Sequence, residues 1–354
     1  MRIGIITMPL RSNYGGILQN YALQTVLKEM GHHPITFRMD KKEYGSWLIS
    51  SIKALMRLRT PSCPPWIFRK RFVGMERFVD QYIDVTKRQD SFSSSNIEEY
   101  GLDALCVGSD QVWRPMYMYY MHLEDMFFQF AKEKTLLKFS YAASFGTSDW
   151  EFSDNQTEKC SALIQNFKGI SVREESGVEL CQKYFRVTAQ WVLDPTLLLS
   201  AAHYMKLCQD IPQRDKFLYA YILDMSTEKV EFIHKVGDIM GLQVLIVSAG
   251  ADIKPDDSPE KWISYFRDAS YVITDSYHGT IFSIIFHCDF LIFSNLHRGN
   301  ARFDSLVKML GIGSQVISDS YQFDKSTRPD WNAIQSKWQY WKVSSYKYLE
   351  RVLK

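Results

Sequence analysis

The sequence predicts an α/β protein built from two domains in series. Short β-branched and apolar runs alternate with segments of helical period along most of the chain. The 354 residues are too many for one ordinary hydrophobic core, and a hydrophobic content of 46% is enough for two. Small and polar residues directly follow several predicted strands, and ligands bind at the carboxyl ends of the strands in open α/β sheets. We therefore expect two open sheets with helices, whose polar loops face a cleft between the domains.

The first domain, expected at 1–195, begins with a strand, a glycine loop and a helix. Apolar residues predict a strand over 3–7, and helical spacing predicts a helix over 17–30. The loop between them brings backbone N–H groups close to where a phosphate would bind, although a plain strand-to-helix turn has the same pattern. The candidate substrate-binding residues here are Tyr14, Gly15, Gly16 and Gln19. The remaining elements of this domain are expected at 35–38, 102–107, 139–143, 158–167, 169–172, 174–183 and 191–194.

A basic helical insertion at about 41–82 interrupts this alternation. Residues 41–77 contain nine Lys or Arg and two Glu, a charge of +7, which leaves −5 for the rest of a chain of net charge +2. Its apolar residues fall on one face, as in a helix that lies on an anionic membrane or docks on lipid-linked phosphates. A solvated lid packed on the domain fits the same pattern.

Polar residues after the later strands of the first domain are further site candidates. Asp110 follows the strand at 102–107 and suits orienting a histidine or accepting a proton from a sugar hydroxyl, although it also suits a helix N-cap. Arg173 ends the strand at 169–172, where a guanidinium can bind a carboxylate or phosphate in a bidentate manner. An ion pair with a neighbouring glutamate is the alternative for Arg173. The accompanying polar candidates are Ser109, Gln111 and Ser144.

The second domain, expected at 196–325, contains the main candidate, His278. A buried strand over 271–274 leads through cap-type residues into an apolar helix over 280–286. His278 therefore lies at a strand-to-helix crossing, where helix amides favour an anion and an imidazole can move a proton near neutral pH. A capping loop whose histidine only hydrogen-bonds a neighbour is an equally good interpretation of this unit alone. The associated candidates are Ser276, Tyr277, Gly279 and, at the start of a later helix, Arg302.

The other elements of the second domain follow the same alternation. Beyond them, residues 326–354 carry tryptophans at helical spacing, and we expect a C-terminal helix that crosses back to the first domain. The predicted strands and helices of the second domain, apart from those around His278, lie at 218–223, 229–240, 244–247, 259–268, 290–293 and 303–310.

Composition excludes several functional classes. The net charge of +2 gives no reason to expect a nucleic-acid partner. The six cysteines show no CxxC spacing, so neither a zinc site nor a disulfide framework is indicated, and no metal site is expected. No window approaches the ~20 apolar residues of a membrane span, and the N-terminal apolar run is too short for a signal peptide. We expect a cytoplasmic protein with peripheral contact to a membrane surface.

Six motifs in a fixed order resemble the polysaccharide pyruvyl transferase family. They are NYGGILQNYALQ (13–24), VGSDQVWRP (107–115), YAASFG (141–146), ISVREESG (170–177), VLDPTLL (192–198) and TDSYHGTIFSIIF (274–286). The resemblance covers roughly residues 1–310. It implies a GT-B-like fold of two Rossmann-like domains facing a cleft. It also implies transfer of pyruvyl from phosphoenolpyruvate to two hydroxyls of one sugar, which forms a ketal during cell-surface polysaccharide biosynthesis.

The resemblance also implies roles for individual residues. His278 corresponds to the family's catalytic histidine, an acid or base, and Arg173 to an arginine that binds the anionic donor. Ser276 stands where characterised relatives have an arginine, and Arg302, Arg298 and Arg11 are candidates to replace that cation. Asp110 is the candidate for the second acid–base group. The expected partners are phosphoenolpyruvate as donor, with no cofactor, and a sugar or lipid-linked oligosaccharide as acceptor.

Two other functions are compatible with the sequence. One is a glycosyltransferase of the same fold that uses a nucleotide sugar, which the order of the six motifs disfavours. The other is a non-catalytic glycan-binding relative, which the serine at position 276 leaves open.

Overall fold

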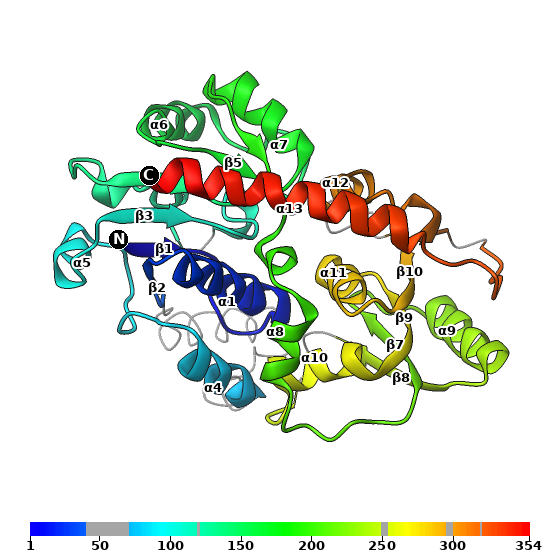
Figure 1. The fold of residues 1–354 in the computed structure, drawn as a ribbon. Helices are drawn as coiled ribbons and strands as arrows, with labels where there is room; N and C mark the ends of the chain where they lie inside the picture. Colours follow the sequence, from blue (N-terminus) through cyan, green and yellow to red (C-terminus); the bar gives the residue numbers. More distant parts are fainter. Residues whose placement is uncertain (40–70, 119–120, 249–253, 295–299, 319–320) are drawn as a thin grey trace, which may run out of the picture.

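Two parallel β-sheets organise the molecule (Figure 1). The computed structural model describes residues 1–39, 71–118, 121–248, 254–294, 300–318 and 321–354. The first sheet has the strand order β2-β1-β3-β4 and the second has the order β11-β10-β9-β7-β8. Every strand pair in both sheets is parallel, so the predicted α/β fold class is confirmed. The strands are β1 (Arg2–Ile6), β2 (His33–Thr36), β3 (Ala104–Val107), β4 (Leu137–Ser140), β7 (Phe217–Ile222), β8 (Gln243–Ser248), β9 (Ala269–Thr274), β10 (Asp289–Phe293) and β11 (Val316–Ile317).

A short parallel pair extends the first sheet beyond β4. The strands β5 (Ser171–Val172) and β6 (Gln190–Trp191) pair with each other, and single parallel bridges join β4 and the residues after it to β5. The predicted strand over 139–143 ends earlier, at Ser140, because Ala142 has a φ of 49° and leaves the extended conformation. The loops after β3, β4, β5 and β6 consequently lie side by side at one edge of the sheet.

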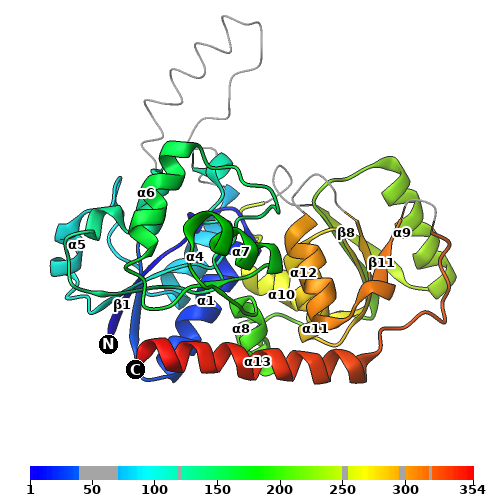
Figure 2. The same cartoon turned by 90° about the horizontal axis from the view of Figure 1, so that it is seen from above.

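Helices cover both sheets, and side-chain caps begin several of them (Figure 2). Ser226, Ser258 and Ser276 each accept a hydrogen bond from a backbone N–H of the first turn, at α9, α10 and α11 respectively. Gly241 ends α9 with a φ of 66°, which an L side chain rarely adopts. The helices are α1 (Tyr14–Glu29), α4 (Val73–Tyr82), α5 (Ser94–Glu99), α6 (Asp154–Ile164), α7 (Glu175–Leu180), α8 (Ala201–Leu207), α9 (Thr227–Met240), α10 (Pro259–Asp268), α11 (Tyr277–Ile285), α12 (Asn300–Leu310) and α13 (Trp331–Leu353).

Several helices begin earlier than the sequence predicts, among them the two that carry candidate site residues in their first turns, α1 and α11. α1 starts at Tyr14, so Gly15 and Gly16 lie in its first turn rather than in the preceding loop. α11 starts at Tyr277, so His278 also lies in a first helical turn. Both glycines have low helix propensity, and tertiary packing at these positions overrides that preference.

One continuous hydrophobic cluster joins the two sheets. It contains side chains of β1 and β3 together with side chains of β7, β9, β10 and the helices between them. Two smaller clusters lie on the other faces of the sheets, one on the first sheet and one on the second. Tyr14 of α1 stacks on Trp262 of α10 with 5.5 Å between ring centroids. The strands of the first sheet precede residue 195, and those of the second sheet follow it. The domain limits 1–195 and 196–325 stay a prediction.

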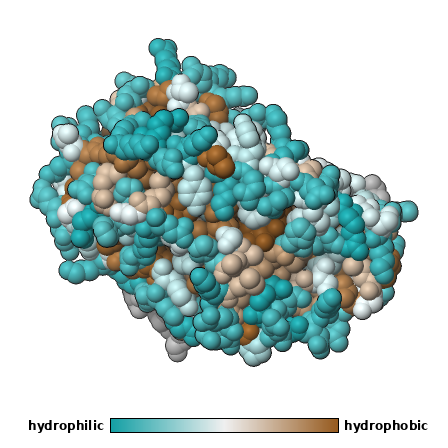
Figure 3. Space-filling view, viewed as in Figure 1, coloured by the Kyte–Doolittle hydropathy of each residue, from teal (hydrophilic) through white to brown (hydrophobic). Residues whose placement is uncertain are grey.

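The long helix α13 lies across both sheets (Figures 1 and 2). At its start, Trp331 stacks on His287 of the second domain with ring centroids 3.9 Å apart. Further along, the Trp338 indole donates to the carbonyl of Leu197, 2.8 Å away. Near its end, the Tyr348 hydroxyl donates to the carbonyl of Ser140 in β4, at 2.7 Å. The face viewed in Figure 3 is mostly hydrophilic, with apolar residues between the polar ones toward its centre.

Most of the predicted basic insertion, 41–70, lies outside the described residues. Its described remainder contains α4, whose Met75, Phe78 and Val79 are buried in the main hydrophobic cluster. The Gly74 amide also donates to the carbonyl of Pro255 in the second domain, at 3.1 Å. α4 is therefore a packed helix of the domain junction. Within the described ranges, no helix is both long and apolar enough to cross a bilayer.

Candidate functional site

Charged side chains from both domains meet in a buried group at the domain junction. Loops after the strands of the first sheet contribute four of them, and the first turns of α11 and α12 contribute the others. No member is more than 9% exposed. We call this group the junction cluster; it comprises Asp110, Arg173, Glu174, Asp194, Tyr277, His278 and Arg302.

Asp194 has polar partners from three residues, two of which are members of this group. Its Oδ1 accepts hydrogen bonds from the Thr196 amide at 3.0 Å and from the Thr196 hydroxyl at 2.6 Å. Its Oδ2 lies 2.7 Å from Nη1 of Arg173 and 3.6 Å from Nε2 of His278. Burial opposes ionisation, but His278, Arg173 and Thr196 hold the pKa of Asp194 well below its ordinary value. Asp194 is therefore a buried carboxylate shared by a cation of the first domain and the histidine of the second.

Arg173 is buried and fixed by its neighbours. Its Nη2 lies 3.4 Å from Oδ1 of Asp110, in addition to the ion pair with Asp194. Its guanidinium also lies over the Tyr277 ring, 4.8 Å from the centroid. Burial disfavours its charge, yet Tyr277, Asp194 and Asp110 raise the pKa of Arg173. The predicted ion pair of this arginine is found, but with two aspartates distant in sequence rather than with the adjacent glutamates.

His278 packs against the first turn of α1. A Cβ at Gly15 would lie 2.0 Å from Nδ1 of His278, so the imidazole occupies the space that any side chain would need. With Nε2 near Asp194, Nδ1 faces the amino terminus of α1. The backbone amides of a first helical turn have no partner within the helix and favour an anion. The sequence prediction that a glycine turn and His278 belong to one site is thus consistent with the geometry.

Asp110 adopts a backbone conformation that is uncommon for a residue with a side chain. Its φ is 79°, in the left-handed region. Its Oδ1 accepts from the amide of Gln111 at 2.8 Å, and its Oδ2 would be 3.3 Å from a Cβ at Gly16. The carboxylate within ion-pair distance of His278 is that of Asp194, and the acid–base role of Asp110 stays a prediction.

Arg302 brings a second guanidinium to Tyr277. Its Cζ lies 5.6 Å from the centroid of that ring, and burial and the charge of Arg173 lower the pKa of Arg302. Burial raises the pKa of the Tyr277 hydroxyl above its ordinary value. Arg302 is thus next to the turn that contains Ser276, as expected for a replacement cation. Arg298 lies outside the described residues.

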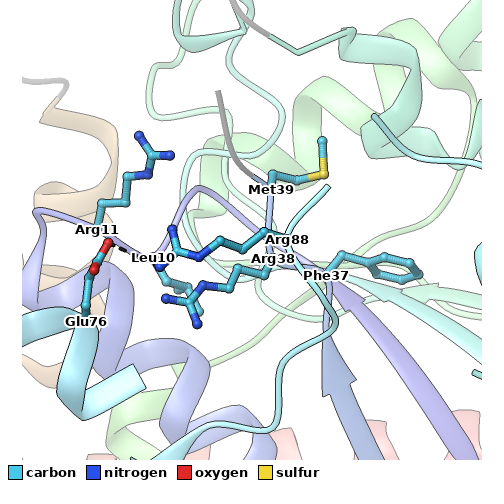
Figure 4. A pocket seen from close by; sticks show the side chains of 7 residues that line it. All are labelled: Leu10, Arg11, Phe37, Arg38, Met39, Glu76 and Arg88. Atoms are coloured by element: carbon cyan, nitrogen blue, oxygen red, sulfur yellow. Dashed lines mark hydrogen bonds and ion pairs between the residues drawn. The ribbon is translucent and has the colours of Figure 1, made fainter. Parts of the chain in front are cut away.

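Arg11 lines a separate small hollow (Figure 4). This hollow is at the carboxyl end of β1 and β2, and three arginines surround it. Arg38 pairs with Asp80, and Arg88 lies 3.3 Å from Glu76. The lining residues are Leu10, Arg11, Phe37, Arg38, Met39, Glu76 and Arg88.

Several predicted ligands are engaged in contacts within the protein. The Gln19 side chain donates to Thr7 and accepts from the Ser109 amide, which ties α1 to β1 and β3. Ser109 donates to the carbonyl of Ala142, and Gln111 accepts from Arg114. Ser276 caps α11 by accepting from the Gly279 amide at 3.2 Å. These contacts position the loops of the junction cluster, and the ligand roles of these residues stay predictions.

Ser144 lies in a loop that is hydrogen-bonded to Glu174. Its hydroxyl donates to Oε1 of Glu174, which also accepts from the amides of Phe145 and Gly146. Burial raises the pKa of Glu174, although Arg173 and these hydrogen bonds act in the opposite direction. From the sequence, Glu174 is expected only as an ion-pair partner of Arg173.

Sequence reasoning missed Asp194 as a site residue. Its place at the end of a strand and before Pro195 has a purely structural explanation, although it follows a buried strand in the same way as Asp110. Applying the strand-end criterion to this residue as well would have found it.

In the part of the chain that the structure describes, no group of three or more His, Cys, Asp or Glu residues is arranged to hold a metal ion.

Comparison with solved structures shows a shared fold. The UDP-GlcNAc 2-epimerase from Methanocaldococcus jannaschii matches with a TM-score of 0.51 and 9% identity, covering 96% of this chain and 92% of that one. The spinosyn rhamnosyltransferase SpnG complexed with thymidine diphosphate matches with a TM-score of 0.44 and 8% identity, covering 100% and 96%. The epimerase likeness supports the predicted GT-B-like architecture of two α/β domains.

Sequence comparison identifies the family. A search of curated proteins gives no match. A family model described as polysaccharide pyruvyl transferase matches residues 13–297, which is most of the chain. The matched region contains the glycines of α1, the loops that carry Asp110, Arg173 and Asp194, and the first turn of α11. The chain therefore belongs to the polysaccharide pyruvyl transferase family.

Proposed function

We propose that this protein transfers the pyruvyl group of phosphoenolpyruvate to two hydroxyls of one sugar, forming a ketal during polysaccharide biosynthesis. The observation that carries this proposal is the position of His278. It is buried between a carboxylate, Asp194, and the amino terminus of α1, with two arginines alongside Tyr277. A proton-transfer group beside cations and helix amides suits a substrate with a carboxylate and a phosphate.

The residues supply the groups that the reaction needs. His278 protonates C3 of phosphoenolpyruvate, which makes C2 cationic and open to attack by the first sugar hydroxyl. That hydroxyl passes its proton to a base, for which Asp110 is the candidate. The C2–O bond to phosphate then breaks with its electron pair leaving on phosphate, and the second hydroxyl attacks C2 and loses its proton. The products are the ketal and inorganic phosphate.

Anionic groups of the donor bind to groups already present at the junction. The first-turn amides of Gly15 and Gly16 and the guanidinium of Arg302 face this region from the two domains. Arg173 binds the donor only if the donor competes with Asp194 and Asp110 for its guanidinium. We therefore expect donor binding to rearrange the ion pairs of Arg173.

The acceptor binds on the first domain. The hollow with Arg11, Arg38 and Arg88 is at the same edge of the sheet as the first turn of α1, and its positive charge suits a phosphate linked to the acceptor (Figure 4). An acceptor carried on a membrane lipid and a peripheral location at the membrane surface remain part of this proposal. Replacing Arg38 and Arg88 by glutamine should raise the KM for a phosphate-linked acceptor without changing the KM for phosphoenolpyruvate.

The test is calorimetric titration of the purified protein with phosphoenolpyruvate, followed by mass analysis of candidate sugars for a gain of pyruvate. We expect phosphoenolpyruvate to bind the wild type and His278→Asn, and ketal formation to disappear in the variant. His287→Asn is a matched control, since His287 stacks on Trp331 outside the junction cluster.

The alternative functions give different results in the same experiment. Binding of a nucleotide sugar, without binding of phosphoenolpyruvate in the presence of acceptor sugars, would replace this proposal with a glycosyltransferase. Unchanged ketal formation by His278→Asn would remove the proposed role of His278.

A further inference from the structure

One oxygen of Asp194 is shared between the two domains. Oδ2 lies 2.7 Å from Nη1 of Arg173 and 3.6 Å from Nε2 of His278. The other oxygen is held by two hydrogen bonds from Thr196, so the carboxylate cannot rotate freely to serve one partner alone. The Asp194 side chain is fully buried, and its charge is therefore poorly screened by water.

We propose that Asp194 is a positioning residue that orients His278 and sets the pH at which His278 holds its proton, with Arg173 competing for the same carboxylate oxygen. A negative charge at this distance stabilises the imidazolium form, and the guanidinium of Arg173 opposes it. Because Asp194 faces Nε2, Nδ1 is the nitrogen that faces Gly15 and the amino terminus of α1.

The charged groups around His278 come from every element packed near it. Tyr277 of the same helix presents its ring edge-on, with ring centroids 5.3 Å apart. Arg302 of α12 and Arg173 after β5 lie at that tyrosine ring. Asp110 after β3 lies beside Gly16 and Arg173, and α1 contributes backbone amides. Of the carboxylates in the described residues, Asp194 is the one within ion-pair distance of the imidazole.

The direct test is the pH titration of His278 followed by NMR of histidine-labelled protein, with His278→Asn used to assign the signal. In Asp194→Asn, the titration midpoint of His278 should fall by about one pH unit or more, because an opposite charge has been removed. In Arg173→Gln the midpoint should rise, because the competing cation has been removed. A merely structural Asp194 would not give shifts of opposite sign in the two variants.

The NMR test has a control variant and a second variant in case Asp194→Asn does not fold. Asp268→Asn removes another aspartate, whose side chain is 4% exposed and pairs with Arg267 at 2.7 Å outside the junction cluster, and should leave the His278 midpoint unchanged. If Asp194→Asn does not fold, Arg173→Gln still tests the competition between Arg173 and His278 for Asp194. In that variant His278 is the remaining cationic partner of the Asp194 carboxylate within the junction cluster. An unchanged or lower midpoint in Arg173→Gln, or an unchanged midpoint in folded Asp194→Asn, would overturn the proposal.

The kinetic consequence rests on the proposed pyruvyl transfer. With His278 as the acid, Asp194→Asn should lower kcat by about 10²-fold or more, and activity should disappear at a lower pH on the alkaline side. The alkaline limb should move by the same amount as the NMR midpoint. If the wild type forms no ketal, the proposed function fails while the titration results stand. If ketal forms with an unchanged pH profile in Asp194→Asn, the role of Asp194 fails.

Discussion

At the scale of single residues, the packing of His278 against the helix explains why position 15 is a glycine. A Cβ at this position would meet the imidazole of His278 at 2.0 Å, whereas one at Gly16 would come to 3.3 Å from Asp110. The two glycines are neighbours in the same helical turn, so alanine improves helix propensity equally at both positions. They therefore form a matched pair for testing how tightly His278 must be held.

We predict that Gly15→Ala lowers catalytic activity by about 100-fold, because a displacement of the reacting group by ~1 Å has an effect of that size. Gly16→Ala should stay within about tenfold of the wild type. Steady-state kinetics of both variants, with melting temperatures as a check on folding, provide the measurement. Equal losses in the two variants would contradict the close contact between Gly15 and His278.

A second prediction concerns Glu174, a fully buried carboxyl whose pKa is raised by burial. A carboxyl with a raised pKa stabilises the fold in its protonated form. That stability is complete below the ordinary glutamate value of about 4.3 and is lost as the pH rises through the folded value. Glutamine keeps an acceptor for the amides of Phe145 and Gly146 and never ionises. The melting temperature of Glu174→Gln minus that of the wild type should therefore increase as the pH rises.

Glu179→Gln is the control for this prediction, since Glu179 belongs to α7, the helix that begins directly after Glu174, and is exposed. Its difference from the wild type should be nearly independent of pH. A difference for Glu174→Gln that shrinks with rising pH would show that the cations around Glu174 outweigh its burial.

Residue type and position at strand ends and helix starts were sufficient to predict His278, Arg173, Asp110 and Arg302 as neighbours in one region. They did not reveal that Arg173 would be satisfied by two aspartates, because the pairing depends on how β5 and β6 align. Long-range partners of this kind have no local signal in a single sequence. Asp194 was visible in principle, but the proline after it suggested a purely structural explanation.

At the scale of elements, α13 supports the loop that contains Asp194. The Ser345 hydroxyl accepts from the amide of Leu193 at 3.0 Å and donates to the carbonyl of Trp341 at 2.8 Å. Ser345 is completely buried, so no water can replace it without rearrangement. We predict that Ser345→Ala lowers the free energy of unfolding by about 1–3 kcal/mol, because the Leu193 amide loses its partner.

Ser336→Ala on the exposed side of the same helix is the control. Its hydroxyl donates only to the carbonyl of Asn332 within α13, and the change should stay within about 0.5 kcal/mol. Chemical denaturation of the two variants and the wild type gives the comparison. A Ser345→Ala variant as stable as Ser336→Ala would mean that the Leu193 amide finds another partner.

The sequence predicted the existence of the main elements better than their ends. The helix over 259–268 agrees with α10, and strands such as β7 and β9 are within two residues of their predicted limits. The starts of α1 and α11 were missed because glycines and cap-type residues there suggested loops. The predicted helix over 174–183 changes at Cys181 into a π turn that ends at Arg186, whose φ is 56°. The short helices α5 and α8 were too brief to show a period.

At the scale of the whole molecule, the two domains share one hydrophobic cluster and should unfold together. Trp262 of the second domain stacks on Tyr14 of the first and also contacts Phe266 and Phe282. We predict a single calorimetric unfolding transition, and a loss of about 3–5 kcal/mol in Trp262→Ala, because a large buried ring is removed. Two separate heat-absorption peaks in the wild type would contradict a shared core.

The architecture as a whole followed from the alternation of strands and helices, because parallel sheets need helical crossovers. The packing between the domains did not follow, since it depends on aromatic side chains such as Tyr14 and Trp262, which any core could contain. The family resemblance rested on the order of motifs, which include the loops and the first helical turns that carry the junction cluster.

The crossing of α13 has a consequence for how the chain acquires its structure during synthesis. Tyr348 bonds to Ser140, which precedes it by 208 positions, and Leu349 and Val352 are buried in the same cluster. A ribosome therefore releases all strands of the first domain long before the helix that covers them. The second domain can form during this interval, but the first remains open on one side. The packing of the first domain is completed only once the segment around Tyr348 has emerged.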